Sequence, residues 1–179
     1  MRNDALLRIA TAEPQTLRDH DRVGAGMQRW RHEFPDIDCS GKAVVGRLLH
    51  LHEVFLSAIE RTLAKHRLKY PAFAVLATLR VEGAPYRMSP KALLDSLILT
   101  SGGLSNLLRR LEKAGHIRRM ADETDGRGVI VELTEQGRCI VEPAMRDHAE
   151  TERRLVAMLS AAEQRNTAEA LGKMMLGAL

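Results

Sequence analysis

The stretch LTSGGLSNLLRRLEKAGHIRRMADETDGRGVIVELTEQG, residues 99–137, decides the fold of this chain. Its first part predicts a helix from Ser101 to about Ala114, because leucines recur at three-and-four spacing and Ser101 is placed to cap the free amides. Gly115 is expected to end this helix. The apolar segments 117–120 and 129–133 follow, and the polar, glycine-containing segment between them predicts a β-hairpin tip.

A second helix is expected directly before this stretch. Ser89 can cap it, Pro90 suits its first turn, and it runs to about Leu97, which leaves residues 98–100 as a tight turn. A helix, a short turn, a second helix and a hairpin together predict a winged helix-turn-helix with a two-stranded wing.

The sequence on both sides is expected to be helical, so that the fold is mainly α. The expected helices span residues 14–31, 44–66, 72–81, 134–159 and 161–177. Residues 34–42 read as a linker, Thr134 and Ser160 as helix caps, and Pro143 as a bend. The helix over 44–66 should bury one broad stripe, made of Val45, Leu48, Leu49, Phe55, Leu56, Ile59 and Leu63.

Composition excludes several classes of protein. With 179 residues, 45% of them hydrophobic, the chain can bury a core, and no apolar run approaches the roughly 18 residues that span a bilayer. We expect no membrane association and, since no secretory signal is visible, a cytoplasmic location. Cys39 and Cys139 are too far apart in sequence for a metal pair and are expected to be reduced thiols. The sequence contains no catalytic or phosphate-loop motif, so we expect neither an enzyme nor a cofactor.

Basic charge is concentrated around the helix pair. The whole chain has a formal net charge of +4, whereas residues 87–119 hold seven basic residues against two acids, or +5. The basic residues are Arg87, Lys91, Arg109, Arg110, Lys113, Arg118 and Arg119. A basic face of this kind suits duplex DNA, because neutralising phosphates releases counterions and supplies most non-specific affinity. Aromatic residues make up only 3% of the chain, which disfavours a stacking platform for single strands.

The helix from Ser101 is the predicted recognition helix. Leu104, Leu107 or Leu108, and Leu111 should face inward, and the residues predicted to contact DNA are Ser101, Gly102, Gly103, Ser105, Asn106, Arg109 and Arg110. The small residues at the start let the helix N-terminus approach a phosphate. Short polar side chains beyond them can reach base edges, and asparagine can pair with adenine.

The hairpin tip is the second predicted contact. Arg127 lies between two glycines, free of bulky neighbours, and can therefore enter a narrow minor groove, whose negative potential attracts arginine. Asp125 can pair with Arg127 or another arginine and shape the loop.

Residues 99–137 resemble the MarR family of winged-helix transcriptional regulators. The motifs that carry the resemblance are RLEKAGHIRR at 110–119, the Asp-x-Arg at 125–127 and LTEQG at 133–137, and a looser similarity covers 44–158. The start Thr100-Ser101-Gly102-Gly103, residues 76–80 and an added N-terminal helix with Trp30 resemble the PecS and HucR branch, whose members are urate-responsive repressors. The resemblance adds Thr100 to the residues expected at DNA.

What the resemblance implies is a homodimer that binds an inverted-repeat operator, with recognition helices in successive major grooves and wings in the flanking minor grooves. Unmatched apolar faces on the end helices predict a dimer independently. We therefore divide the chain into an N-terminal extension with an added helix and linker (1–42), a winged helix-turn-helix DNA-binding domain (43–142) and C-terminal dimerisation helices (143–179).

The implied signal is a small-molecule effector that relieves repression. The urate-responsive pattern has Asp after the Phe that matches Phe73 and Arg after the Asn that matches Asn106, whereas this chain has Ala74 and Leu107. Because both charged partners are lost, urate is expected to be a poor effector. Trp30 is retained, although packing in the core is favoured for it over contact with an effector.

Two alternative functions remain open. Cys39 lies just ahead of a predicted helix and close to Lys42, both of which would activate a thiol, so the protein can be a redox-sensing regulator; Cys139 is expected to be buried in a dimerisation helix. A winged helix can also bind another protein instead of DNA, but the predicted recognition face is polar and basic. His50 and His52, two positions apart, point to different faces of a helix and do not predict a metal site.

Overall fold

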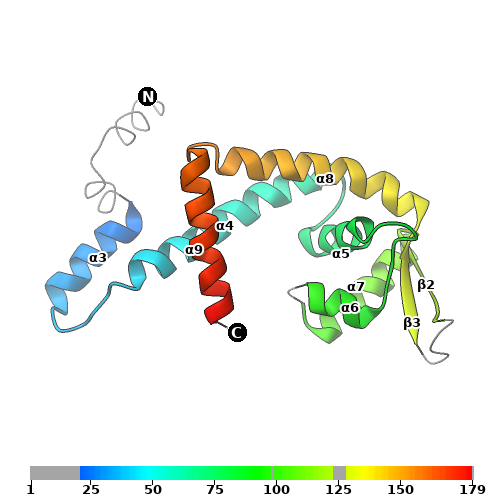
Figure 1. The fold of residues 1–179 in the computed structure, drawn as a ribbon, viewed down its shortest axis with the longest axis horizontal. Coiled ribbons are helices and arrows are strands. Elements are labelled where there is room, and N and C mark those ends of the chain that lie inside the picture. The colour runs from blue at the N-terminus through cyan, green and yellow to red at the C-terminus, as the bar shows by residue number, and fades with distance from the viewer. Residues whose placement is uncertain (1–20, 98, 123–127, 179) are drawn as a thin grey trace. The chain divides into compact units, whose positions relative to one another are not determined.

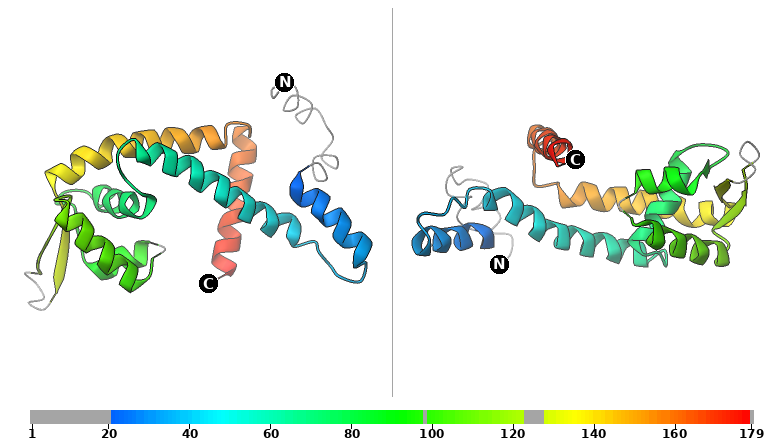
Figure 2. Two further views of the ribbon diagram at one scale, coloured as in Figure 1. Left: turned by 180° about the vertical axis from the view of Figure 1, so that it is seen from behind. Right: turned by 90° about the horizontal axis from the view of Figure 1, so that it is seen from below.

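The computed structural model describes residues 21–97, 99–122 and 128–178. The chain divides between Leu56 and Ser57 into two compact units, here called unit 1 and unit 2. Figures 1 and 2 show the helices and strands of the chain in three views. Within the described residues, none of the helices combines the length and apolar character needed to cross a bilayer.

Unit 1 contains α3 (Arg22–Glu33) and the first part of α4 (Lys42–Ala64). Asp21 caps α3, because its carboxylate accepts hydrogen bonds from the amides of Val23 and Gly24, both at 2.8 Å. Its other oxygen accepts a 2.8 Å bond from Nε of Arg47 on α4. The predicted helix from Pro14 is found only from Arg22 onward, and its first residues, 14–20, lie outside the described ones.

Unit 2 contains the winged helix-turn-helix. α5 (Tyr70–Val81), α6 (Pro90–Ser96) and α7 (Ser101–Lys113) pack around a small sheet, and α8 (Glu135–Leu155) and α9 (Ala161–Gly177) follow (Figure 1). The predicted wing is confirmed as β2 (Ile117–Ala121) paired antiparallel with β3 (Val129–Leu133). A third strand that the sequence analysis missed, β1 (Arg87–Met88), pairs with the other edge of β3. Two residues are too few to show an alternating pattern.

The core of unit 2 forms where the helix pair meets the sheet and α8. Leu104, Leu108 and Leu111 of α7 are buried, as predicted, and Leu107 is half-buried. The largest fully buried side chains are Leu63, Leu76, Leu79, Leu93, Ile117, Val75, Val131 and Val141. These eight residues come from four helices and two strands, and with the buried leucines of α7 they form one cluster, so the winged unit and α8 share one core.

Two expectations about the helices are wrong. Thr100, not Ser101, caps α7: its backbone is extended, and its hydroxyl accepts the amide of Gly103 at 3.2 Å, while Ser101 is already helical. The stripe on α4 is not buried, since only Leu63 of its seven residues is buried and Leu49 remains 66% exposed. The spacing of apolar residues shows which face of the helix is apolar, but it does not show whether another part of the chain covers that face. On α4, few side chains of this chain do so.

The last two helices have the predicted caps; α9 also has the predicted boundaries, whereas α8 ends at Leu155, before the predicted end at 159. The hydroxyl of Thr134 accepts the amide of Gly137 at 3.0 Å at the start of α8, which continues through Pro143. Ser160 and Glu163 form a capping box at the start of α9. No residue of α9 is buried, and its apolar residues Met174, Met175 and Leu176 are exposed.

Candidate nucleic-acid interface

α7 presents one polar face and one buried face. Its leucines pack inward, and every residue predicted to contact DNA on this helix is exposed: Thr100, Ser101, Gly102, Gly103, Ser105, Asn106, Arg109 and Arg110. The exposed face therefore carries small, polar and basic groups. Such a face suits the edges of bases and phosphates better than an apolar protein partner.

The two glycines at the start of α7 have different physical explanations. A Cβ atom on Gly103 would lie 3.0 Å from the hydroxyl of Thr100, so the cap itself requires a small residue there. A Cβ atom on Gly102 would meet nothing within 4 Å. Packing within the described chain gives no reason for glycine at position 102, whereas close approach of a phosphate to the helix N-terminus does.

Asn106 is held by its own helix. Its Oδ1 atom accepts a 2.6 Å hydrogen bond from Nη2 of Arg109, one turn further along. Bidentate pairing with adenine uses both the oxygen and the amide nitrogen of asparagine. The contact with Arg109 takes one lone pair of that oxygen and orients the amide, so the two side chains act together at this face.

Glu112 connects the end of α7 to the wing. Its carboxylate accepts three hydrogen bonds from Arg119 on β2: from the backbone amide at 3.1 Å, from Nε at 2.8 Å and from Nη2 at 2.5 Å. The hydrogen bonds from Arg119 hold the pKa of Glu112 below its usual value. Both guanidinium bonds go to Oε2 and the backbone amide donates to Oε1, and together these contacts fix the wing strand against the recognition helix.

Glu132 holds a second cluster across the sheet. Strand register places it opposite Arg87 on one side and Arg118 on the other, and it accepts bonds of 2.6 Å and 2.5 Å from them. Burial would raise the pKa of Glu132, but the hydrogen bonds from both arginines outweigh burial and lower it. Three of the seven basic residues in the segment 87–119 are thus paired with carboxylates.

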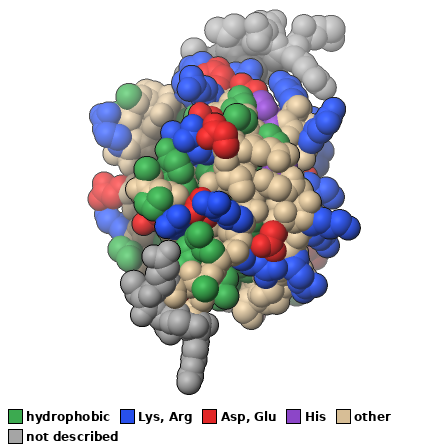
Figure 3. All heavy atoms as spheres, turned by 90° about the vertical axis from the view of Figure 1, so that its right-hand side faces the viewer, with side chains coloured by type: hydrophobic (Ala, Val, Ile, Leu, Met, Phe, Trp, Pro, Cys, Tyr) green, Lys and Arg blue, Asp and Glu red, His purple; other side chains and the backbone are tan. Residues whose placement is uncertain are grey.

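The remaining four basic residues are available to phosphates. Lys91, Arg109, Arg110 and Lys113 are exposed and form no ion pair with a carboxylate in the part of the chain that the structure describes. Figure 3 looks onto the end of unit 2 that carries β2 and β3, where Lys and Arg side chains occupy much of the surface and Asp and Glu are fewer.

The junction behind the interface explains two of the motifs. Gly115 ends α7 with a φ of +76°, a left-handed conformation that favours glycine, and its carbonyl accepts a 2.6 Å bond from the hydroxyl of Thr134. A Cβ atom on Gly137 would lie 2.1 Å from the carbonyl oxygen of His116, which leaves no room for any other residue. Glycine at these two positions lets the first turn of α8 pack closely against the segment that joins α7 to β2.

The tip of the wing lies outside the described residues, and with it Asp125 and Arg127. The hairpin closes on the described side with a 3.0 Å bond from the amide of Asp122 to the carbonyl of Gly128. The minor-groove role of Arg127 and the loop-shaping role of Asp125 therefore stay predictions.

The predicted effector residues belong to different units. Trp30 lies on α3 in unit 1, whereas Ala74 on α5 and Leu107 on α7 are half-buried in unit 2. The expectation that Trp30 packs in the core is wrong: it is 41% exposed, with Phe34 at 5.8 Å between ring centroids and Nζ of Lys42 4.5 Å above its ring. α3 buries Gly24 and Met27 instead, on another of its faces.

The cysteines and histidines form no shared centre. Cys39 is half-buried ahead of α4, and Cys139 is exposed on α8, which corrects the expectation that it is buried. Its Sγ atom lies 3.7 Å from Glu135. Among residues 21–97, 99–122 and 128–178, no three His, Cys, Asp or Glu side chains are grouped so that they could hold a metal ion.

The sequence analysis missed the roles of Glu112, which it counted only as charge, and of Glu132. Once the hairpin register is assigned, Arg118 falls opposite Glu132, so that pair was accessible from the sequence. The pair of Glu112 and Arg119 joins a helix end to a strand and had no such signal.

Comparison with known proteins decides the family. The family model described as transcriptional regulator SarA/Rot matches residues 57–143. The HTH-type transcriptional regulator PecS of Dickeya dadantii is 35% identical over 147 residues, which cover 82% of this chain and 89% of PecS. The chain belongs to the MarR family of winged-helix transcriptional regulators. As a MarR-family protein it is a transcriptional regulator and not an enzyme.

Solved structures share the MarR fold. Sco3205 of Streptomyces coelicolor, a MarR-family regulator solved in complex with DNA, has a TM-score of 0.70 and 23% identity over 77% of this chain and 88% of its own. BpsR of Bordetella bronchiseptica has a TM-score of 0.66 and 24% identity over 73% of this chain and 92% of its own. At these identities the likeness supports the fold.

Proposed function

We propose that this MarR-family protein binds an inverted-repeat operator as a homodimer and represses transcription until a small-molecule effector binds. The observation that carries the proposal is the exposed face of α7, whose polar and basic residues stand beside a wing fixed to the same helix by Glu112. In this arrangement α7 enters the major groove, and Arg127 at the wing tip enters the minor groove. Sco3205, which shares the fold, was solved with DNA.

The exposed apolar faces support the homodimer. Val45, Leu49 and Val54 of α4 are exposed, and so are Met174 and Met175 of α9. Exposed apolar side chains in this number are costly for a lone chain, and a two-fold partner would cover them. Sedimentation of the purified protein should give twice 20.0 kDa, or 40 kDa.

The test of operator binding is a mobility shift on the DNA that flanks the protein's own gene. Because two-fold protein symmetry must be mirrored in the DNA, footprinting should show two half-sites centred about 10 base pairs apart. Asn106→Ala should weaken specific binding by about 1–3 kcal/mol and relax preference at one base position. Arg127→Ala should instead affect A·T-rich flanks most. A single asymmetric footprint, or variants that bind every sequence as the parent does, would contradict the proposal.

The effector is expected to differ from urate. DNA binding by BpsR is regulated by 6-hydroxynicotinic acid, so a relative with this fold responds to a small molecule. Here Ala74 and Leu107 replace the charged pair of the urate-responsive pattern, and the half-exposed Trp30, the single tryptophan, reports on ligands nearby. Titration with urate should leave Trp30 fluorescence and DNA affinity unchanged. Tight urate binding with release of DNA would overturn this part.

The site of action follows from the activity. A regulator that binds chromosomal DNA works where the chromosome is, and we infer a cytoplasmic location on that ground.

The redox alternative has its own test. Peroxide-induced release of DNA that disappears in Cys39→Ser would favour the redox mechanism over the small-molecule signal.

A further inference from the structure

A pocket of about 450 Å³ lies in unit 2 between the end of α4 and the end of α8. Its lining consists of Ala58, Arg61, Thr62, Lys65, Thr151, Arg154 and Leu155. Three of these residues are cations and none is a carboxylate. The volume is in the range of small-molecule sites, and the lining combines apolar surface with a few convergent charges.

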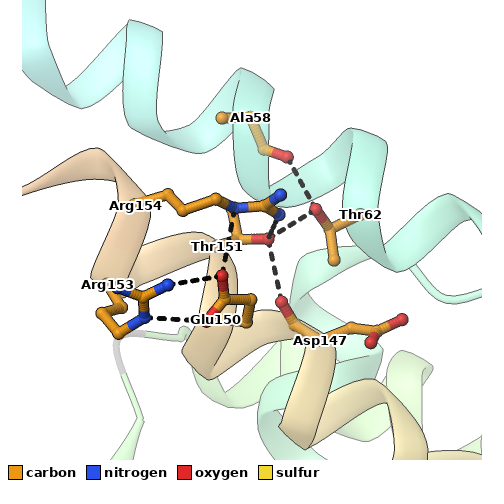
Figure 4. A network of polar contacts seen from close by, with 7 residues as sticks. All are labelled: Ala58, Thr62, Asp147, Glu150, Thr151, Arg153 and Arg154. Atoms are coloured by element: carbon orange, nitrogen blue, oxygen red, sulfur yellow. Dashed lines mark hydrogen bonds and ion pairs between the residues drawn. The ribbon is translucent and has the colours of Figure 1, made fainter. Parts of the chain in front are cut away.

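The floor of this pocket is built. Thr62 and Thr151 are only 7% and 5% exposed, and their hydroxyl groups lie 2.8 Å apart across the two helices (Figure 4). The hydroxyl of Thr151 also donates to the carbonyl of Asp147 at 2.8 Å, and that of Thr62 lies 3.3 Å from the carbonyl of Ala58. The contact between the two threonine hydroxyl groups joins α4 and α8 at the floor of the pocket.

The cations around the pocket are only partly neutralised. The guanidinium of Arg154 reaches over Thr151, with Nη2 at 3.4 Å from its hydroxyl, and Nε lies 3.7 Å from Glu150 (Figure 4). Glu150, however, accepts two shorter bonds of 2.8 Å from Arg153. Arg61 donates to the neutral hydroxyl of Ser57 at 2.8 Å. The pocket therefore has an excess of positive charge.

Two of these cations also repel one another. Arg61 lies in the last turn of α4, and Lys65 follows directly after the helix, which ends at Ala64. Both line the same pocket, and like charges repel. An anion placed between them and Arg154 would remove this repulsion and join the two helices. A carboxylate fits the role, because the arginine fork binds its two oxygens in parallel.

The pocket is remote from the DNA-binding face. Thr151 follows Gly137 by 14 residues on α8, which is about 20 Å at 1.5 Å per residue. Gly137 marks the end of α8 that meets the recognition helix. DNA phosphates bound at α7 therefore do not account for these cations.

We propose that this pocket binds a small organic anion, with a carboxylate held by Arg61, Lys65 and Arg154 and a compact apolar body against Ala58 and Leu155. The site shares no residue with Trp30, Ala74 and Leu107, at which effector binding was expected. It concerns ligand binding alone, so its test contains no DNA and is independent of the operator proposal.

The test is calorimetric titration of the full-length protein with three probes: benzoate, uncharged benzamide of the same shape, and inorganic phosphate. Benzoate should bind, should bind at least about tenfold more tightly than either other probe, and should raise Tm by binding the folded state. No binding of benzoate, equal affinity for benzamide, or equal affinity for phosphate would each overturn the proposal.

Variants locate the site. Arg154→Gln and Lys65→Gln should each weaken benzoate binding by about tenfold, because each removes one charged contact. Arg165→Gln, which removes the same charge from an exposed position on α9 outside the pocket lining, is the matched control and should change affinity by less than about twofold. All variants should keep the circular dichroism spectrum of the parent. Equal effects of Arg154→Gln and Arg165→Gln would place benzoate elsewhere and overturn the assignment.

Discussion

At the scale of single residues, Gly102 separates the needs of the fold from those of DNA binding. It is the second residue of α7, and an added methyl group would meet no atom within 4 Å. Gly102→Ala should therefore stabilise the protein by about 0.5–1 kcal/mol, since alanine loses less backbone entropy on folding. The same methyl group should weaken operator binding by about tenfold, because it keeps the helix N-terminus away from a phosphate.

The control for this prediction is Gly26→Ala. Gly26 also lies inside a helix with no atom within 4 Å of an added Cβ, but on α3. It should raise stability similarly in urea denaturation and leave DNA affinity unchanged. If Gly102→Ala binds the operator as tightly as the parent, position 102 does not approach a phosphate.

His116 provides a prediction about pH. Burial lowers its pKa from 6.5, and its Nδ1 atom is buried with no hydrogen-bond partner in the described part of the chain. The folded protein therefore favours neutral His116, while the unfolded chain takes up a proton below about 6.5. Stability from this group is complete above that pH and is lost as the pH falls below it.

The measurement compares the parent with His116→Gln in urea denaturation at pH 7.5 and 5.5. The parent should lose more free energy of unfolding between the two pH values than the variant, which cannot titrate at this position. Equal losses would show that His116 contributes nothing to the pH dependence. His66 and His148, which face Asp147 and Glu152, are present in both proteins, so the comparison isolates His116.

At the scale of elements, the pair of Glu112 and Arg119 sets the wing against the recognition helix. Glu112→Ala should reduce operator affinity by about tenfold, the scale of one lost base-pair contact, because the wing is no longer held in register. It should also raise affinity for unrelated DNA and steepen the salt dependence by about one phosphate, because Arg119 is released and a negative charge is removed.

Opposite changes in specific and non-specific binding distinguish positioning from simple loss of fold. Glu112→Gln keeps an oxygen for the backbone amide of Arg119 and should be intermediate between the alanine variant and the parent. Glu169→Gln, on α9 and paired with Lys173, removes the same charge away from the wing and should leave both affinities unchanged. Parallel losses on both kinds of DNA would refute the positioning role.

At the scale of the whole molecule, the pairing of charges predicts the salt dependence of DNA binding. Four of the seven basic residues in 87–119 have no carboxylate partner in the described residues, so a two-fold dimer brings about eight cations to phosphates. The slope of log affinity against log salt should then be about −7, at −0.9 per phosphate. If all seven acted in each protomer, the slope would approach about −13. Fluorescence anisotropy between 50 and 300 mM salt measures the slope, and a nearly flat response would count against DNA binding altogether.

The residue pattern determined most of the winged unit. Leucine spacing in 101–111, the caps at Ser89, Thr134 and Ser160, and the hairpin around 117–133 all follow from local rules, and each appears as predicted. Local rules succeed there because helix caps, helix faces and hairpins depend on residues only a few positions apart.

Only the tertiary structure decided what joins distant segments. β1 forms because β3 has a free edge with which it can pair. Glu112 bonds Arg119 because α7 ends beside β2. The cations near the ends of α4 and α8 line one pocket because Thr62 contacts Thr151 there. Exposure of the stripe on α4 and of Trp30 belongs to the same class. A sequence records which side chains are apolar or charged, but their partners depend on where the packed core places each backbone segment, and no spacing along the chain encodes that distance.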